Sequence, residues 1–222
     1  MYIKSKCCHK NLNRNKHDVS FDNIHSRESK VYCMCAPITK IRNKTPQQLL
    51  EMCGQKDHIP VDLRALLNKL SISCVRYDFS NIERELNRES CSQEKKILGA
   101  LVTNGDHAVI FCRDQDEEDG HRYRFTVAHE LGHCCLEHFD IGQSSVHYVF
   151  RTDDEVPDNK EIEANIFAGE LLIPEESLKK AIGELVIPSV QSLSKIFAVS
   201  ENVMLKRLDY LKLPKIVSGY NY

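Results

Sequence analysis

Residues 124–133 contain two histidines four positions apart, and this spacing constrains the fold more strongly than any other feature of the sequence. On an α-helix, His129 and His133 project from one face about a turn apart, so one nitrogen of each ring can reach the same metal ion. Glu130 follows His129 directly, which places its carboxylate beside such a metal, where it can take a proton from a bound water. The H-E-x-x-H arrangement therefore predicts a helix that presents two metal ligands and a general base.

The flanking residues favour the same helix. Apolar side chains recur at helical spacing and predict a buried back face, formed by Val127, Leu131, Cys134 and Cys135. We expect Thr126 to cap the N-terminus of this helix and the alternating run before it to form a strand. A surface helix that carries two histidines without a metal is the alternative.

Composition limits the compartment and the partners. The chain has 222 residues, enough for one domain with a buried core, and its net charge of −2 gives no argument for binding nucleic acid or an acidic membrane. No apolar run approaches the roughly 20 residues of a transmembrane helix, and the N-terminus lacks the apolar core of a secretory signal. Ten irregularly spaced cysteines then favour reduced thiols over disulfides. We expect a cytoplasmic protein with no membrane contact.

Residues 1–44 differ from the rest of the chain. They hold ten Lys or Arg against three acidic residues and show no sustained apolar period. Such a segment buries too little apolar area to offset its ordering entropy, so a disordered basic arm is expected. A basic arm that contacts nucleic acid is the alternative. We place the folded domain at residues 45–174 and a C-terminal helical segment, packed on it, at residues 175–222.

Capping residues predict the first two helices of the domain. Thr45 and Gln48 form a capping box at the start of a helix that ends at Gly54, and Asp62 caps the next helix. Three apolar runs then predict a small antiparallel sheet, over residues 72–77, 97–102 and 107–112. The last two runs favour a hairpin because Asn-Gly lies between them.

Two stretches are expected to be loops. Residues 80–96 are strongly hydrophilic and allow at most one helical turn. Residues 139–160 show no period, and a loop of this length between two helices predicts a segment that restricts access to a site. The sequence as a whole thus predicts an α+β fold, in which a small sheet delivers the metal-binding helix.

The C-terminal segment predicts a helix-turn-helix. Residues 189–208 favour two helices joined by a tight turn, with Ser200 capping the second. Residues 175–215 carry seven Lys or Arg and five acidic residues, a balance of +2. DNA-binding faces are usually more basic. We therefore expect this segment to pack on the domain or to contact a protein, without binding nucleic acid directly.

A hydrolytic zinc site needs a third protein ligand and an open fourth position. One known scheme continues the motif with glycine and a third histidine, but Leu136 and Phe139 occupy those two positions and His138 is one residue out of register. That scheme is excluded for this chain.

A glutamate from a following helix is the other source of a third ligand. Glu161 and Asn165 share one face of a predicted helix that Pro174 ends, so Glu161 can ligate the metal while Asn165 bonds the outer nitrogen of a ligand histidine. Glu163 points about 200° away from Glu161 and is the alternative ligand.

These motifs, in this order, resemble the ImmA/IrrE metallopeptidases. The resemblance covers residues 45–213 and rests on residues 60–63, on R-x-F-T-x-A-H-E-L-G-H at 124–133, on E-x-x-A-N-x-F-A-x-E-L-L-x-P at 161–174, and on residues 193–200. Gly169 and Ile173 depart from the usual residues of the family.

The resemblance implies a gluzincin-like zinc endopeptidase. His129, His133 and Glu161 would hold one Zn²⁺ per chain, with Glu130 as the general base. A second donor to the oxyanion is usual in such enzymes. The candidates for it are His138, His147, Tyr148 and Arg151.

The resemblance also implies a partner. Family members are regulators in bacteria, phages and mobile elements that inactivate a helix-turn-helix repressor by cutting it, so we expect a protein substrate of that kind. A DNA-binding or sensory regulator with a structural zinc site is the alternative, but a closed structural site would need a fourth protein ligand.

Overall fold

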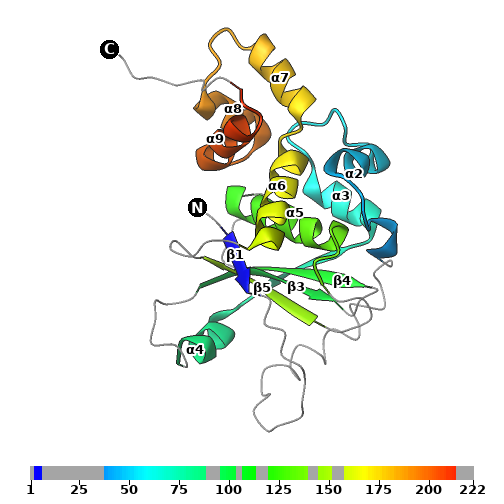
Figure 1. Ribbon diagram of the computed structural model, residues 1–222, viewed down its shortest axis with the longest axis vertical. Helices are drawn as coiled ribbons and strands as arrows, with labels where there is room; N and C mark the ends of the chain where they lie inside the picture. Colours follow the sequence, from blue (N-terminus) through cyan, green and yellow to red (C-terminus); the bar gives the residue numbers. More distant parts are fainter. Residues whose placement is uncertain are drawn as a thin grey trace.

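The computed structural model describes residues 3–6, 38–88, 96–103, 107–113, 120–139, 145–151 and 158–213. Its elements form an α+β fold, as the sequence predicted (Figure 1). The strands are β1 (Ile3–Lys6), β2 (Ser73–Tyr77), β3 (Lys96–Thr103), β4 (Ala108–Arg113) and β5 (Ser145–Arg151). The helices are η1 (Ile38–Lys40), α2 (Pro46–Cys53), α3 (Leu63–Leu70), α4 (Ser80–Arg88), α5 (His121–Cys135), α6 (Asn159–Leu172), α7 (Glu175–Glu184), α8 (Val190–Phe197) and α9 (Glu201–Tyr210).

The strands form one sheet in the order β1-β5-β3-β4-β2. β3 pairs antiparallel with β4 and β5, so the predicted hairpin is present, although its Asn104 and Gly105 lie outside the described residues. The expectation of a purely antiparallel sheet is wrong at β2, which runs parallel to β4. The reason is the connection: the chain passes from β2 through α4 to β3 before the hairpin returns it to β4.

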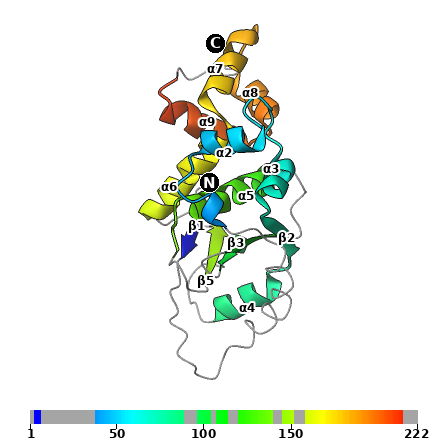
Figure 2. The same ribbon diagram turned by 90° about the vertical axis from the view of Figure 1, so that its right-hand side faces the viewer.

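The sheet separates two layers. α5 and α6, with α2 and α3, cover one face, while α4 lies on the opposite side (Figures 1 and 2). Side chains of the central strands alternate between the layers, as the pleat requires. Leu101 and Ile110 join the main core beneath the helices, whereas Ala100 and Phe111 join the smaller core against α4. The sheet thus serves as the floor on which α5 and α6 lie.

Local capping signals predicted α2 and α3 correctly. The Thr45 hydroxyl accepts a hydrogen bond from the Gln48 backbone, and the Gln48 side chain accepts one from the Thr45 backbone. Gly54 ends α2 in the left-handed conformation, with φ of 70°. The Asp62 carboxylate accepts a hydrogen bond from Ala65 at the start of α3. The three hydrogen bonds join residues three positions apart, and the left-handed turn needs one glycine, so the sequence alone reveals all of these signals.

The ordered core begins before residue 45. Ile38 and Ile41 are 1% and 2% exposed and belong to the main core. The backbone N–H of Asn43 also donates to the carbonyl oxygen of Cys135 at the end of α5, at 2.7 Å. The expectation of disorder is therefore wrong for residues 38–44, because two isolated isoleucines in a basic run give no visible period. β1 pairs with β5, and residues 7–37 lie outside the described part of the chain.

The hydrophilic stretch after β2 contains a full helix, α4, where at most one turn was expected. The Glu83 carboxylate accepts hydrogen bonds from the backbone N–H of Ile97, at 2.6 Å, and from the buried guanidinium of Arg113. Phe79 and Ile82 pack against the sheet. A narrow apolar stripe and the ion pair between Glu83 and Arg113 hold this helix against the sheet. The hydrophilic composition of the stretch therefore gave no sign of a full helix.

The C-terminal helices share the main core. Apolar side chains of α7, α8 and α9 are buried in it, namely Leu178, Val190, Leu193, Phe197, Met204 and Leu208. Ser200 caps α9 as predicted, accepting a hydrogen bond from Val203. Ala198 forms the turn between α8 and α9 in the left-handed conformation, with φ of 50°. The described part of residues 175–222 is therefore built onto the helices that carry the site.

Two buried arginines join these helices to the site. Arg124 of α5 donates from Nε to the carbonyl oxygen of Ala198, at 3.1 Å, and from Nη2 to that of Val61, at 2.9 Å. Arg207 of α9 donates from Nε to the carbonyl oxygen of Ile173, at 3.1 Å, just after α6 ends. Hydrogen bonds from a charged group to buried carbonyls are among the stronger ones in proteins. They fix α8 and α9 against α5 and α6.

The two buried cysteines at the end of α5 are thiols, in line with the composition. Cys134 and Cys135 are fully buried, and burial raises the pKa of both thiols above their ordinary value. They act as small apolar residues of the core. Within the described residues, no helix has both the length and the apolar character that crossing a membrane requires.

Gly132 lies where α5 meets α6, and a side chain has no room there. A Cβ would lie 3.1 Å from Phe167 Cβ and 3.3 Å from both the Cα and the carbonyl oxygen of Ala164. Because backbone atoms cannot move aside easily, we expect Gly132→Ala to destabilise the protein by about 1–3 kcal/mol. Thermal unfolding measures the change.

Gly183 of α7 supplies the matched control. A Cβ at Gly183 meets nothing within 4 Å, so Gly183→Ala should raise stability by up to about 1 kcal/mol through the better helix propensity of alanine. Equal destabilisation by both substitutions would show that the close approach of α5 and α6 is not the cause.

Candidate metal centre

α5 is longer than its motif indicated. It begins at His121 after Gly120, and Thr126 lies inside it, fully buried, so the predictions of a Thr126 cap and of a preceding strand are wrong. Arg124, Val127, Ala128 and Leu131 are all buried. Their helical spacing extends the back face of α5 to Arg124. Because Arg124 is charged, the apolar pattern in the sequence stops short of it.

His129 and His133 meet on the buried side of α5. They are 0% and 1% exposed, and their Nε2 atoms lie 3.0 Å apart. Burial lowers the pKa of His133 well below its ordinary value, so its imidazole is neutral and has a lone pair for a metal. The predicted spacing of four residues thus brings two ring nitrogens to one point.

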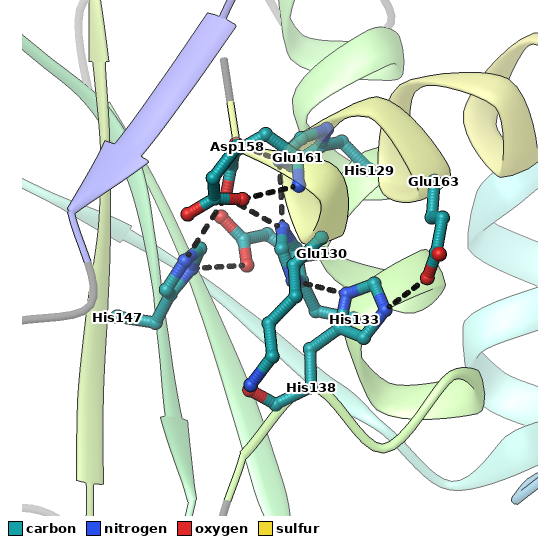
Figure 3. Close-up of polar contacts among 9 residues, drawn as sticks. His129, Glu130, His133, His138, His147, Asp158, Glu161 and Glu163 are labelled. Carbon is teal, nitrogen blue, oxygen red and sulfur yellow. Dashed lines mark hydrogen bonds and ion pairs between the residues drawn. The ribbon is translucent and has the colours of Figure 1, made fainter.

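α6 brings Glu161 to the same point. Asp158 caps α6 by accepting a hydrogen bond from the Glu161 backbone N–H at 2.9 Å. The two Glu161 oxygens lie 3.4 Å from His129 Nε2 and 3.4 Å from His133 Nε2 (Figure 3). Burial alone would raise the pKa of this carboxyl, but the bonds from the histidines outweigh it and hold the pKa below its usual range. Glu161 is therefore an ionised, buried carboxylate.

The three residues have the geometry and chemistry of a zinc site. Their donor atoms all lie within 4.8 Å of one another, and all three side chains are buried. Ligand atoms about 2.0–2.1 Å from a tetrahedral zinc ion are roughly 3.3 Å apart. The separations of 3.0, 3.4 and 3.4 Å match that spacing. Two histidines and one carboxylate form the ligand set of catalytic zinc sites, which leave a fourth position open.

Glu130 lies beside the cluster and outside it. Its side chain is fully buried, and neither carboxylate oxygen has a hydrogen-bond partner among the described residues, although Oε2 lies 3.6 Å from His147 Nδ1. A buried carboxylate without hydrogen bonds is costly unless a ligand or a water meets it. Its position is the one that the sequence predicts for a general base next to a metal.

A comparison with protein families finds a match. The Peptidase M78 model, described as an IrrE N-terminal-like domain, matches residues 90–209, more than half of the 222 residues. The chain belongs to this family. A comparison with curated proteins finds no match. The matched residues include α5 and α6, so in this M78 chain the buried cluster is the place that could hold the metal of a metallopeptidase.

Glu163, the alternative ligand, lies away from the cluster of His129, His133 and Glu161. Its side chain is 58% exposed, and its Oε2 lies 3.0 Å from His138 Nε2. One turn of α6 thus directs Glu161 to His129 and His133, and Glu163 to His138 (Figure 3).

His147, one of the four candidate oxyanion donors from the sequence, lies at the site. It lies on β5, where the expected loop at 139–160 is wrong, because residues 145–151 pair with the central strand β3. His147 Nε2 lies 3.4 Å from Glu161 Oε1, and its Nδ1 lies 3.6 Å from Glu130 Oε2. Burial lowers the pKa of His147, but the two carboxylates outweigh it and raise the pKa to about 9. The aromatic and β-branched residues around it were the available signal for a strand.

The other candidate residues from the sequence lie at different distances from the cluster. Of the candidate oxyanion donors, His147 faces the cluster and His138 lies behind His133, while the side chains of Tyr148 and Arg151 lie outside the described part. Asn165 Nδ2 and His129 Nδ1 are buried and have no hydrogen-bond partner among the described residues. The bond expected from Asn165 to the outer nitrogen of a ligand histidine is therefore not formed, because His129 Nδ1 has no such partner and His133 Nδ1 meets His138 instead.

Proposed function

We propose that this M78 peptidase is a cytoplasmic zinc endopeptidase that cleaves a helix-turn-helix repressor at one or a few bonds. The observation that carries the proposal is the buried triad of His129, His133 and Glu161, with the buried carboxylate of Glu130 beside it and facing only His147, at 3.6 Å, among the described residues. A structural zinc site would close its coordination with a fourth protein ligand and would not need such a carboxylate.

The residues of the chain divide the chemistry among them. A zinc ion bound by the triad would supply a Lewis acid and a water of lowered pKa. Glu130 takes the proton from the attacking water and later delivers it to the leaving amine. His147 contacts Glu130 on its other side, at 3.6 Å, and holds its carboxylate in place. His147 is also the favoured second hydrogen-bond donor to the oxygen of the scissile carbonyl, because its imidazole ring faces the cluster.

The exposed face of α9 supports a protein partner over DNA. Leu205 and Tyr210 are 40% and 53% exposed, and Glu201 and Asp209 are exposed beside them. Phosphate recognition needs clustered positive charge, whereas Lys206 is the single cation of α9 that is partly exposed. An aromatic and an aliphatic side chain are suited to a protein surface.

The test compares a folded repressor with an unfolded protein. Zinc-loaded enzyme is incubated with a candidate helix-turn-helix repressor and, separately, with casein, and Glu130→Gln enzyme is the matched control. We expect discrete repressor fragments from the unaltered enzyme alone and slow loss of casein. Rapid casein digestion with an intact repressor would refute the regulatory function, and equal cleavage by the Glu130→Gln enzyme would refute the zinc peptidase mechanism.

A further inference from the structure

His138 lies directly behind the metal ligand His133. Its Nδ1 is 2.9 Å from His133 Nδ1, and its Nε2 is 3.0 Å from Glu163 Oε2 (Figure 3). The three side chains therefore form a line that starts at the exposed Glu163 and ends at the buried ring of His133. This line reaches the one ring nitrogen of His133 that does not face the cluster.

The line determines which nitrogen of His133 carries a proton. The Glu163 carboxylate can only accept, so His138 carries its proton on Nε2. A neutral His138 then has a lone pair on Nδ1 and accepts from His133 Nδ1–H. His133 is left with its lone pair on Nε2, the atom that faces His129 and Glu161 at 3.0 and 3.4 Å. The opposite tautomer would direct a proton at the metal position.

The backbone of His138 is anchored as firmly as its ring. Its N–H donates to the carbonyl oxygen of His133 at 3.1 Å, and the Lys160 ammonium donates to its own carbonyl oxygen at 3.0 Å. Glu137 takes a left-handed conformation, with φ of 54°, that turns the chain back beneath α5. Lys160, Glu161 and Glu163 lie on one turn of α6. Glu161 contacts His133 at the cluster, while Lys160 and Glu163 hold His138, which contacts the other nitrogen of His133.

We propose that His138 and Glu163 are positioning residues that hold His133 in its metal-binding tautomer. The inference rests on the metal site of the proposed function and adds two residues to it. Groups that orient a ligand histidine typically contribute 10–100-fold to metal affinity. We therefore expect Glu163→Ala to weaken zinc binding about 10-fold or more and Glu163→Gln to weaken it less, because the amide oxygen still accepts from His138.

Metal affinity is measured directly, without a peptide substrate, by competition with a chelator and by the visible absorption of bound Co²⁺. Glu176→Ala is the matched control, since Glu176 is 90% exposed on α7 and far along the chain from the triad. Weaker binding in Glu163→Ala with unchanged binding in Glu176→Ala supports the inference. Equal affinities in Glu163→Ala and the unaltered protein overturn it.

Two substitutions at His138 separate hydrogen bonding from packing. His138→Phe keeps an aromatic ring but removes the acceptor, whereas His138→Asn keeps an acceptor near the position of Nδ1 and loses ring volume. Positioning through the hydrogen bond predicts tighter metal binding by His138→Asn than by His138→Phe. The reverse order would show that His138 only fills space and would overturn the inference.

The tautomer itself has a spectroscopic signature. In metal-free protein with ¹⁵N-labelled histidine, long-range ¹H–¹⁵N correlations should show the proton of His133 on Nδ1, and Glu163→Ala should shift part of the population to Nε2. An unaltered His133 signal in Glu163→Ala contradicts the inference. If the unaltered protein binds no metal, the proposed function fails together with this inference, whereas binding that resists all these substitutions removes the inference alone.

Discussion

Peptide cleavage by Glu130→Gln is expected to fall by about 10²–10⁴-fold, the usual contribution of a general base. Glutamine matches the shape of glutamate, so the buried site keeps its packing, and Glu130 lies outside the triad that could hold the metal. The substitution removes the basic oxygen and leaves the ligands. Metal content and the unfolding temperature should therefore stay near their original values.

Single-turnover cleavage of the repressor proposed as substrate, measured together with bound zinc, checks this result. Glu176→Gln is the control, because Glu176 is exposed on α7 and should leave the rate unchanged. Full activity in Glu130→Gln would remove the general-base role. Loss of zinc in the same variant would instead place Glu130 among the ligands.

Glu161→Gln is expected to weaken zinc binding by more than about 100-fold, beyond the 10–100-fold typical of residues that only orient a ligand. Glu161 is the single carboxylate within reach of both ligand histidines, at 3.4 Å from each, among the described residues. Its charge offsets part of the charge of the metal, and a neutral amide cannot do so. Cleavage should disappear in parallel with the zinc.

Glu163→Gln is the matched substitution on the same helix. It should cost much less affinity, because Glu163 points to His138 and away from the triad. A larger loss in Glu163→Gln than in Glu161→Gln would show that the two glutamates have been assigned the wrong way round. Removing zinc with a chelator should also lower the unfolding temperature of the unaltered protein and have little effect on Glu161→Gln, since a ligand stabilises only the state that binds it.

The parts of the fold that the sequence predicted depend on near neighbours. The caps at Thr45, Asp62 and Ser200 involve residues three positions apart, and the motif of α5 spans five. Glu161 follows from the same reasoning, because a helix that directs one glutamate to a site turns Glu163 away from it. Local geometry gave the two histidines and narrowed the third ligand to Glu161 or Glu163, and the packing of α6 on α5 brings Glu161 to the histidines.

The missed parts depend on contacts between residues far apart in the sequence. β5 is a strand because β3 pairs with it, and residues 145–151 give only a weak pattern by themselves. His147 could not be chosen among the candidate oxyanion donors, since its contact with Glu130 requires the sheet to face α5. His138 reaches the back of His133 only because Glu137 turns the chain and Lys160 holds it.

The hydrogen bonds of Arg124 and Arg207 limit which parts of this fold could be transferred to another protein as a separate module. A helix-turn-helix is often a unit that moves between proteins intact. Here α8 and α9 provide a carbonyl acceptor for the helix that carries His129 and His133, and α9 provides a cation for the chain just after α6. Exchanging the pair for an unrelated module would leave the buried Arg124 of α5 with its bond to Val61 but without its acceptor at Ala198, at a cost of about 1–3 kcal/mol. Such an exchange would have to recreate both polar bonds along with the apolar surface, so the C-terminal helices and the metal helices are expected to be inherited together.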